Sequence, residues 1–302
     1  MSAAKMHANE IDIDVSLVSR LITRQFPQWA DLPLKQVPSA GTDNAIYRLG
    51  DDMAVRLPRI PGAVDQVGKE QKWLPRLAPH LPLRIPLPLG SGVPGEGYPW
   101  SWSVYGWLEG ENATTENITD MHRAARDLAR FITDLHAIDH RGGPTPGEHN
   151  FFRGVPLADR DTGTREAIAA LEGVIDTDAA TAAWESAVAV PARTGAPVWI
   201  HGDLSAGNLL VRQGDLSAVI DFGGSSVGDP ACDLMIAWEL FSGSTRETFR
   251  ASMSVDDATW ERGRGWALSV ALIALPYYKD TSPVIADRAR HIIGEVLDET
   301  RP

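Results

Sequence analysis

The sequence predicts an α+β protein of two lobes, a first lobe built mostly from antiparallel sheet and a second lobe that is mostly helical. Short strand-like runs dominate as far as Trp107, whereas helical periodicity takes over after the segment Leu108-Glu109-Gly110-Glu111. With 302 residues and 43% hydrophobic content, the chain can bury a core in each of two lobes. We therefore expect a first domain at residues 1–107 and a second at residues 108–302.

The first lobe is expected to begin with an amphipathic helix, because apolar residues recur at helical spacing from Asp14 to Phe26. The pieces Ala40-Gly41-Thr42-Asp43 and Gly50-Asp51-Asp52 are rich in turn-forming residues and favour an antiparallel meander around them. The elements expected after that helix are strands over 34–39, 44–49 and 53–58, a helix over 65–77, and strands over 85–90 and 100–107.

The second lobe is expected to be a set of helices. The first runs from Met121 to about Ile138, and the glycines and proline after Arg141 should end it. The further helices expected in this lobe cover residues 164–175, 178–189, 230–242, 256–275 and 283–299. Residues 142–163 form a long polar loop, and loops of this length in a compact domain are usually functional, so a lid over the substrate is one role for it.

Composition excludes several classes of function. The chain has 28 basic and 40 acidic residues, a net charge of −12, which argues against nucleic-acid or anionic-membrane partners. This charge would suit a cationic substrate, although an acidic excess also serves solubility alone. A single cysteine, Cys232, excludes a disulfide framework and fits the reducing cytoplasm. The N-terminus lacks the apolar core of a signal peptide, and the longest apolar run, Trp266–Tyr278, is too short to span a bilayer.

The strongest local pattern lies within residues 198–211, where two apolar runs flank the loop His201-Gly202-Asp203-Leu204-Ser205-Ala206-Gly207-Asn208. His201-x-Asp203 followed by Asn208 has the spacing of the kinase catalytic loop, with Gly where protein kinases have Arg. A further apolar run then ends in Asp221-Phe222-Gly223. Each motif alone is a common turn, but their order and flanking strands together indicate a catalytic site.

These residue types suit phosphoryl transfer, in which positioning and a divalent metal do most of the work. Magnesium prefers hard oxygen ligands, and Asp221 and Asn208 offer a carboxylate and an amide oxygen. Asp203 is then left to orient a substrate hydroxyl and accept its proton. We expect His201 to stabilise the loop, and Asp229 to brace it or to cap the helix that follows.

The chain resembles the aminoglycoside phosphotransferase family of kinase-like enzymes, which includes macrolide phosphotransferase-like members, over nearly its whole length. The resemblance rests on the loop 201–208, on Ile220-Asp221-Phe222-Gly223, on Gly228-Asp229-Pro230 leading into Asp233-Leu234, and on Leu135-His136-Ala137-Ile138-Asp139. It implies a two-lobed protein-kinase-like fold. It also implies transfer of the γ-phosphate of ATP or GTP, with Mg²⁺ as cofactor, to a hydroxyl of a small molecule.

The first lobe departs from the protein-kinase pattern at the residues expected to bind the nucleotide. Gly41 and Thr42 lie in the turn where a phosphate-covering loop belongs, but the turn lacks the Gly-x-Gly-x-x-Gly form. Arg56 stands where protein kinases carry a lysine, and Glu70 is its natural partner. The alternative to such a pair at the phosphates is that Arg56 is a surface arginine and Glu70 an unrelated glutamate. By position, Tyr105 and Trp107 belong to the purine pocket.

The molecule that accepts the phosphate is the feature that the sequence determines least. Asp233 and Glu239 would suit a polycationic aminoglycoside, and Trp238 with neighbouring aromatic residues would suit an apolar macrolide, although caps and core packing explain the same residues. A small metabolic alcohol is an alternative acceptor. A nucleotide-binding protein without transfer activity is a further alternative, as is a protein kinase, which the missing Ala-Pro-Glu ending disfavours. Antibiotic resistance is one biological role that would fit.

Overall fold

The computed structural model describes residues 10–37 and 43–300 and divides the chain into two compact units. The first unit extends to Gly110 and also contains Ser217–Gly223, and the second holds Glu111–Leu216 and Gly224–Pro302. The sequence had suggested a boundary after Trp107 and had placed Asp221 with the second lobe. Residues 217–223 cluster with the first unit because Arg84 pairs with them, its N–H donating to Ser217 O at 3.3 Å.

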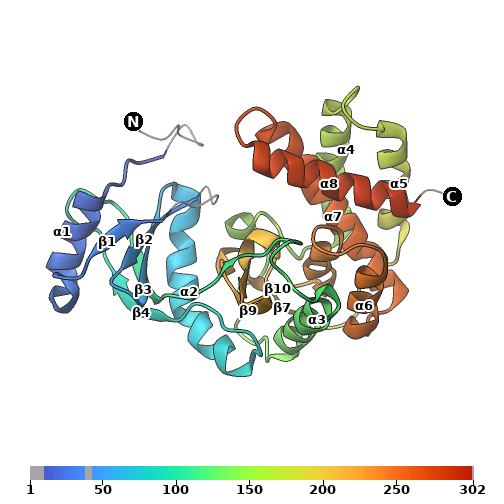
Figure 1. Cartoon of the computed structure of the whole chain (residues 1–302). Helices are drawn as coiled ribbons and strands as arrows, with labels where there is room; N and C mark the ends of the chain where they lie inside the picture. Colours follow the sequence, from blue (N-terminus) through green and yellow to red (C-terminus); the bar gives the residue numbers. More distant parts are fainter. Residues whose placement is uncertain (1–9, 38–42, 301–302) are drawn as a thin grey trace. The chain divides into compact units, whose positions relative to one another are not determined.

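The first unit is built on a five-stranded antiparallel sheet with the order β1-β2-β3-β5-β4 (Figure 1). Residues alternate between buried and partly exposed along β2, as expected for a strand with one face on a core. The strands are β1 Leu34–Gln36, β2 Asn44–Leu49, β3 Met53–Pro58, β4 Pro88–Gly92 and β5 Trp102–Gly106. The strand expectations 44–49 and 53–58 match the structure at both ends, and the turn between them contains Gly50 at φ +61°.

Two helices accompany this sheet, α1 (Val15–Gln25) and α2 (Val64–Leu77). Asp14 caps α1 by accepting from Leu17 N at 2.7 Å, and the helix buries its apolar face in a core shared with the sheet. The short 3₁₀ segments of the unit are η1 Pro27–Trp29, η2 Pro61–Ala63 and η3 Ala78–His80.

The second unit is mainly helical. Its α-helices are α3 Met121–Ala137, α4 Asp161–Ala170, α5 Thr177–Ala189, α6 Gly243–Met253, α7 Asp257–Tyr278 and α8 Pro283–Thr300. Its 3₁₀ segments are η4 Glu148–Asn150, η5 Leu157–Arg160, η6 Ala206–Asn208, η7 Phe222–Gly224, which begins in the first unit, and η8 Pro230–Trp238. Its strands are β6 Glu111–Asn112, β7 Val198–Ile200, β8 Leu209–Arg212, β9 Asp215–Val219, which runs on into the first unit, and β10 Ser226–Gly228. They form two small sheets, β10-β7 and β6-β8-β9.

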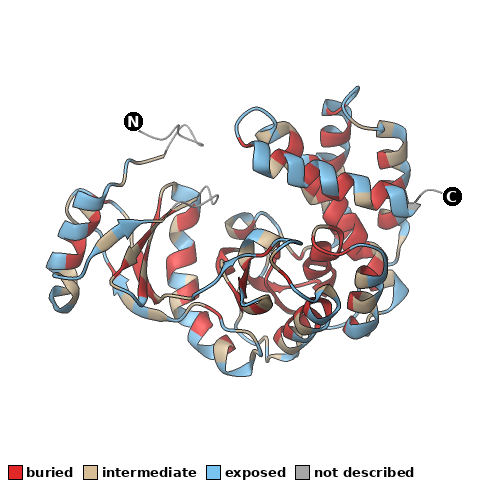
Figure 2. Ribbon diagram, viewed as in Figure 1, coloured by how far each residue is buried: buried red, intermediate tan, exposed pale blue. Residues whose placement is uncertain are grey.

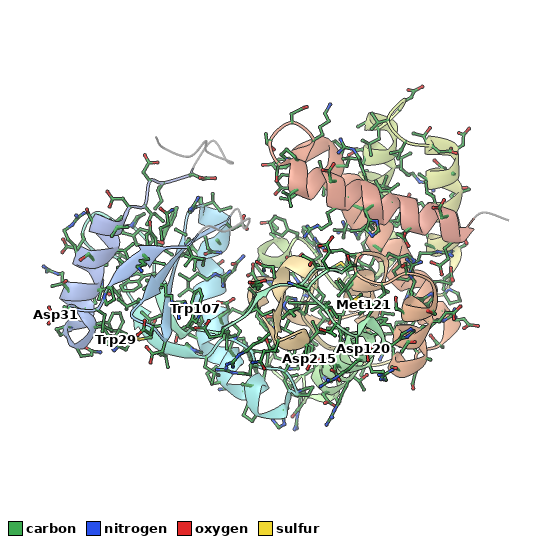
Figure 3. The ribbon with its side chains drawn as sticks, in the orientation of Figure 1. Trp29, Asp31, Trp107, Asp120, Met121 and Asp215 are labelled. Carbon is green, nitrogen blue, oxygen red and sulfur yellow. The ribbon has the colours of Figure 1, made fainter. Side chains whose placement is uncertain are left out.

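Helix α7 forms the centre of the second unit and packs against α8, η8, α5 and α4. Figure 2 shows that α7 is buried over most of its length. A Cβ added at Gly263 would lie 2.7 Å from Leu234 Cβ, so the absence of a side chain lets η8 approach. Asp120, labelled in Figure 3, caps α3 by accepting from Arg123 N at 2.9 Å. Within residues 10–37 and 43–300, no helix has the length and apolar character needed to cross a bilayer.

The helical expectations differ from the structure at several places. The helix expected over 164–175 is α4, which ends at Ala170. The predicted helix over 230–242 is a 3₁₀ segment that ends at Trp238. Helix α6 was not predicted, because it opens with Gly-Ser-Thr, residues that rank below the strong helix formers. A reciprocal pair of hydrogen bonds between Ser242 and Thr245 starts α6 despite this composition.

Candidate active site

In the first unit, Arg56 on β3 is the centre of a charged cluster. Its guanidinium donates to Glu70 Oε1 at 2.5 Å, to Asp221 Oδ1 at 2.7 Å and to Gln66 Oε1 at 3.2 Å. Burial alone would lower the pKa of Arg56, but the Glu70 and Asp221 carboxylates raise it above the usual value. Arg56 therefore stays charged and ties β3 to both α2 and the turn that carries Asp221.

The turn after β9 presents Asp221. This residue has φ +63°, a left-handed conformation that aspartate tolerates better than bulky residues, and its side chain is 43% exposed. Helix α2 holds the turn, because Lys69 Nζ donates to Gly223 O and a Cβ at Gly223 would lie 2.6 Å from Gln66 Oε1. Burial lowers the pKa of Lys69 to about 8.

Tyr105 and Trp107 were expected in the purine pocket, and the structure shows what each of them contacts. The Tyr105 hydroxyl donates to Glu70 Oε2 and is buried, so it supports the carboxylate that pairs with Arg56. The guanidinium of Arg48 lies 4.6 Å from the centre of the Trp107 ring. Trp107 Nε1 is buried and has no hydrogen-bond acceptor among the described residues. Gly41 and Thr42 lie outside the described residues.

In the second unit, β7 leads into the loop that carries Asp203 and Asn208. The Asp203 side chain is 49% exposed, and Asn208 Nδ2 donates to Asp203 O at 2.8 Å and lies 3.4 Å from Asp203 Oδ2. Gly202 has φ +79°, and a Cβ there would lie 2.6 Å from Gly224 O. The loop therefore requires glycine immediately before the exposed aspartate.

A buried carboxylate, Asp233, braces this loop from below. It accepts from His201 N at 2.9 Å and from Gly202 N at 2.8 Å, and His136 Nε2 lies 3.2 Å away. His201 is fully buried, and its Nδ1 accepts from Asp203 N at 3.2 Å. These bonds fix the backbone from which Asp203 projects.

Asp229 begins η8 and accepts from Ala231 N at 3.0 Å. Its carboxylate also pairs with buried Arg262 at 2.9 Å, and Arg262 reaches on to Pro191 O at 3.1 Å. Asp229 therefore joins the start of η8 to α7 and does not project toward solvent.

A pocket opens beside Asp203, lined mostly by aliphatic side chains of α7 and α8 such as Ala271, Ala274 and Ile285. Its other charged lining residues are Glu239 and Arg288. Glu239 Oε1 accepts from Ala206 N at 2.9 Å and lies 3.9 Å from Arg288 Nη1. Burial raises the pKa of Glu239.

Of the three residues expected to contact the acceptor, only Glu239 lines this pocket. Asp233 and Trp238 are fully buried, the first beneath the 201–208 loop and the second against Trp260 with its Nε1 donating to Glu299 Oε2. Buried in this way, neither side chain has surface left for a ligand.

Sequence reasoning missed several residues that shape the site. They are Gln66 and Lys69 on α2, His136 on α3, Arg153 in the 142–163 loop, Arg262 on α7 and Arg288 on α8. His136 lies in a stretch that carries the family resemblance, and Arg153 lies in the loop expected to be functional. No local pattern gives any of these residues a role, however, because each is brought to the site by packing between distant elements.

Comparison with known proteins places these features in a family. The family model described as phosphotransferase enzyme family matches residues 35–266. The GDP complex of wild-type aminoglycoside 2'-phosphotransferase-IIIa superposes with a TM-score of 0.76 at 20% identity, covering 96% of this chain and 100% of that one. Macrolide 2'-phosphotransferase MphH from Brachybacterium faecium gives 0.63 at 22% identity, covering 93% and 97%. ADP-bound aminoglycoside phosphotransferase APH(2'')-Ib gives 0.59 at 15% identity, covering 95% and 99%.

These structural likenesses establish the two-lobed α+β fold that the sequence predicted. No curated protein matches the chain.

Proposed function

This chain belongs to the phosphotransferase enzyme family, and we propose that it transfers the γ-phosphate of ATP or GTP to a hydroxyl of a small, largely apolar acceptor. The observation that carries this proposal is the exposed Asp203 carboxylate beside Asn208, on a loop whose backbone is held by buried Asp233. An exposed, oriented carboxylate that lines a pocket suits a residue that receives a proton from a bound hydroxyl.

The Asp203 carboxylate orients the acceptor hydroxyl and accepts its proton as the oxygen attacks the γ-phosphorus. Because transfer proceeds through a loose transition state, the carboxylate need not be a strong base, and its position matters more than its basicity. Asn208 Nδ2 donates to the Asp203 backbone, so its amide oxygen is the atom available as a ligand.

On the nucleotide side, we assign Asp221 and Asn208 to Mg²⁺ and Arg56 to phosphate. Carboxylate and amide oxygens are the hard donors that Mg²⁺ takes, and the partly exposed Asp221 carboxylate fits this role. When bound, Mg²⁺ neutralises charge on the phosphates. Arg56 already donates to Glu70 and Asp221, so its planar fork is held in place before nucleotide arrives. Tyr105 supports Glu70, and Trp107, Gly41 and Thr42 remain our assignments for the rest of the nucleotide site.

The lining of the acceptor pocket favours a substrate with apolar faces and few positive charges. A polycationic aminoglycoside needs several free carboxylates, but the Glu239 carboxylate already bonds to Ala206 N and lies near Arg288. The aliphatic wall from α7 and α8 suits apolar surface instead. Macrolide-like compounds fit this description better than aminoglycosides, and a hydrophobic metabolic alcohol is the second candidate. We place the reaction in the cytoplasm, where nucleoside triphosphates and Mg²⁺ are available.

A γ-phosphate transfer assay with Mg²⁺ tests this function. ATP and GTP would each be offered with macrolides, aminoglycosides and simple alcohols, and wild type would be compared with Asp203→Asn and with Asp127→Asn. Asp127 is a matched control, because its carboxylate is 41% exposed and lies on α3. Label on a macrolide or alcohol, lost only in Asp203→Asn, is the expected result.

Two other outcomes would change the assignment. Faster labelling of aminoglycosides than of apolar acceptors would reject the proposed substrate class but keep the reaction. Nucleotide binding without label on any compound or in released phosphate would instead favour a binding protein without transfer activity.

A further inference from the structure

Arg153, in the segment between α3 and α4, brings a guanidinium to the catalytic loop. Its Nη2 lies 3.7 Å from Asp203 Oδ1, longer than a hydrogen bond, and only 15% of its side chain is exposed. Its Nη1 donates to Met235 Sδ at 3.4 Å, and sulfur is a weak acceptor. Among the described residues, Arg153 pairs with no carboxylate other than Asp203. Most of its five N–H donors are therefore left for another ligand.

The backbone around Arg153 is held firmly. Buried Asn150 donates through Nδ2 to Arg153 O at 2.9 Å and to Gly224 O at 3.2 Å, and Ser226 Oγ lies 3.2 Å from Arg153 O. The two residues before Arg153 are Phe151 and Phe152, with φ values of +55° and +56°. Left-handed conformations at two successive aromatic residues cost free energy and persist only where the surroundings enforce them, commonly at functional sites.

The catalytic loop leaves room for this side chain. A Cβ added at Gly202 would lie 3.3 Å from Arg153 Cβ, so Arg153 packs directly on the residue before Asp203. The kinase catalytic loop has its own arginine at the position of Gly202. Here a guanidinium from a different segment approaches the aspartate.

A second cation lies in the same segment. Arg160 donates through Nε to Ser269 Oγ at 2.9 Å and lies 4.7 Å over the Trp266 ring, but it forms no carboxylate pair among the residues described. Burial lowers the pKa of Arg160 to about 10, and the charge of Arg153 contributes. The positive charges of Arg153 and Arg160 thus repel each other, and only Arg153 reaches Asp203. A negatively charged ligand beside Arg153 would offset this repulsion.

We propose that Arg153 is a further catalytic residue, whose guanidinium contacts the phosphoryl group as it passes from the nucleotide to the acceptor. This inference rests on the proposed transfer reaction. The bond between the γ-phosphorus and the bridging β,γ-oxygen breaks, the acceptor oxygen bonds to phosphorus, and the hydroxyl proton goes to Asp203. Arg153 neither gains nor loses a proton, and it stabilises negative charge on the phosphoryl oxygens and keeps the Asp203 carboxylate in place.

Steady-state kinetics of Arg153→Ala and Arg153→Lys test this role, with Arg141→Ala as the control. Arg141 lies in the same segment, but its side chain is 86% exposed and pairs only with Asp139 among the described acids. We expect Arg153→Ala to lose about 100- to 1000-fold in kcat, with the nucleotide KM changing only a few-fold. Guanidinium or ethylguanidinium added to Arg153→Ala should restore about tenfold or more of the lost kcat, which a purely structural role would not allow.

The outcomes separate this role from the proposed function. An active wild type, an inactive Asp203→Asn and an Arg153→Ala within threefold of wild type would overturn the role of Arg153 alone. A large loss in Arg153→Ala that added guanidinium does not restore would overturn it too. If Arg153→Ala does not fold, the kcat of Arg153→Lys tests the contact instead. The lysine ammonium cannot reproduce the planar fork of the guanidinium, so an unchanged kcat in Arg153→Lys would exclude the contact. A wild type inactive toward water and every acceptor would remove both proposals.

Discussion

Replacing Asp233 by asparagine tests whether one buried carboxylate holds the catalytic loop in place. The side chain keeps its size, so packing beneath the loop is preserved. One of its oxygens becomes an NH₂ group, however, and can no longer accept from His201 N or Gly202 N, which are now 2.9 and 2.8 Å from the two oxygens. One buried backbone N–H is then left without an acceptor.

The expected loss follows from these contacts. An unsatisfied buried N–H costs about 1 to 3 kcal/mol, and the remaining bond loses its charge assistance, about a further 1 kcal/mol. Asp233→Asn should therefore lower the free energy of unfolding by about 2 to 4 kcal/mol, a large share of the 5 to 15 kcal/mol typical of a folded protein. Because Asp203 follows the displaced backbone, kcat should fall as well.

Urea unfolding followed by fluorescence and circular dichroism measures this loss. Asp134→Asn is the control, since Asp134 lies on α3, is 38% exposed and pairs with Arg130 at 3.6 Å. That variant should stay within about 0.5 kcal/mol of wild type. An Asp233→Asn protein as stable as this control, with unchanged kcat, would show that the buried carboxylate does not hold the loop.

Two further predictions concern buried charges. Lys69 has a pKa of about 8 in the folded protein against 10.5 in the unfolded chain, so the unfolded state binds more protons between these values. Compared with Lys69→Met, wild type should therefore gain up to about 2 kcal/mol of stability as pH rises from 8 to 10. The gain is smaller where water reaches the ammonium, and chemical unfolding across that pH range measures it. Arg262→Met leaves Asp229 buried without its cation and should cost about 3 to 5 kcal/mol, and Asp229→Asn added to it should recover part of the loss in the same assay.

Much of the fold could be predicted because its patterns are local. Strands 44–49 and 53–58 follow from apolar alternation around a turn, and α1 and α8 follow from helical periodicity. Prediction from local patterns fails at α6, where the capping hydrogen bonds of Ser242 start a helix that opens with weak helix formers. It fails again at residues 230–238, where the chain follows a 3₁₀ path.

The candidate site was only partly predictable for a similar reason. Asp203, Asn208 and Asp221 lie on short, ordered motifs, so spacing alone could indicate them. The charge on Asp233 could be seen in the sequence, but its burial beneath the loop could not, and it was therefore assigned to the acceptor. Arg153 is fifty residues from Asp203 along the chain, and no motif connects the two.

The sequence by itself determined the family, most of the order of strands and helices and the identity of the chemical groups, because these depend on neighbours along the chain. Only the tertiary structure decided which of those groups meet. It adds Asp221 to the expected pair of Arg56 and Glu70, and it lines the pocket beside Asp203 with aliphatic side chains of α7 and α8. Such contacts arise when hydrophobic burial packs distant elements together, and a polar group enclosed in that packing must find whichever partner lies within reach.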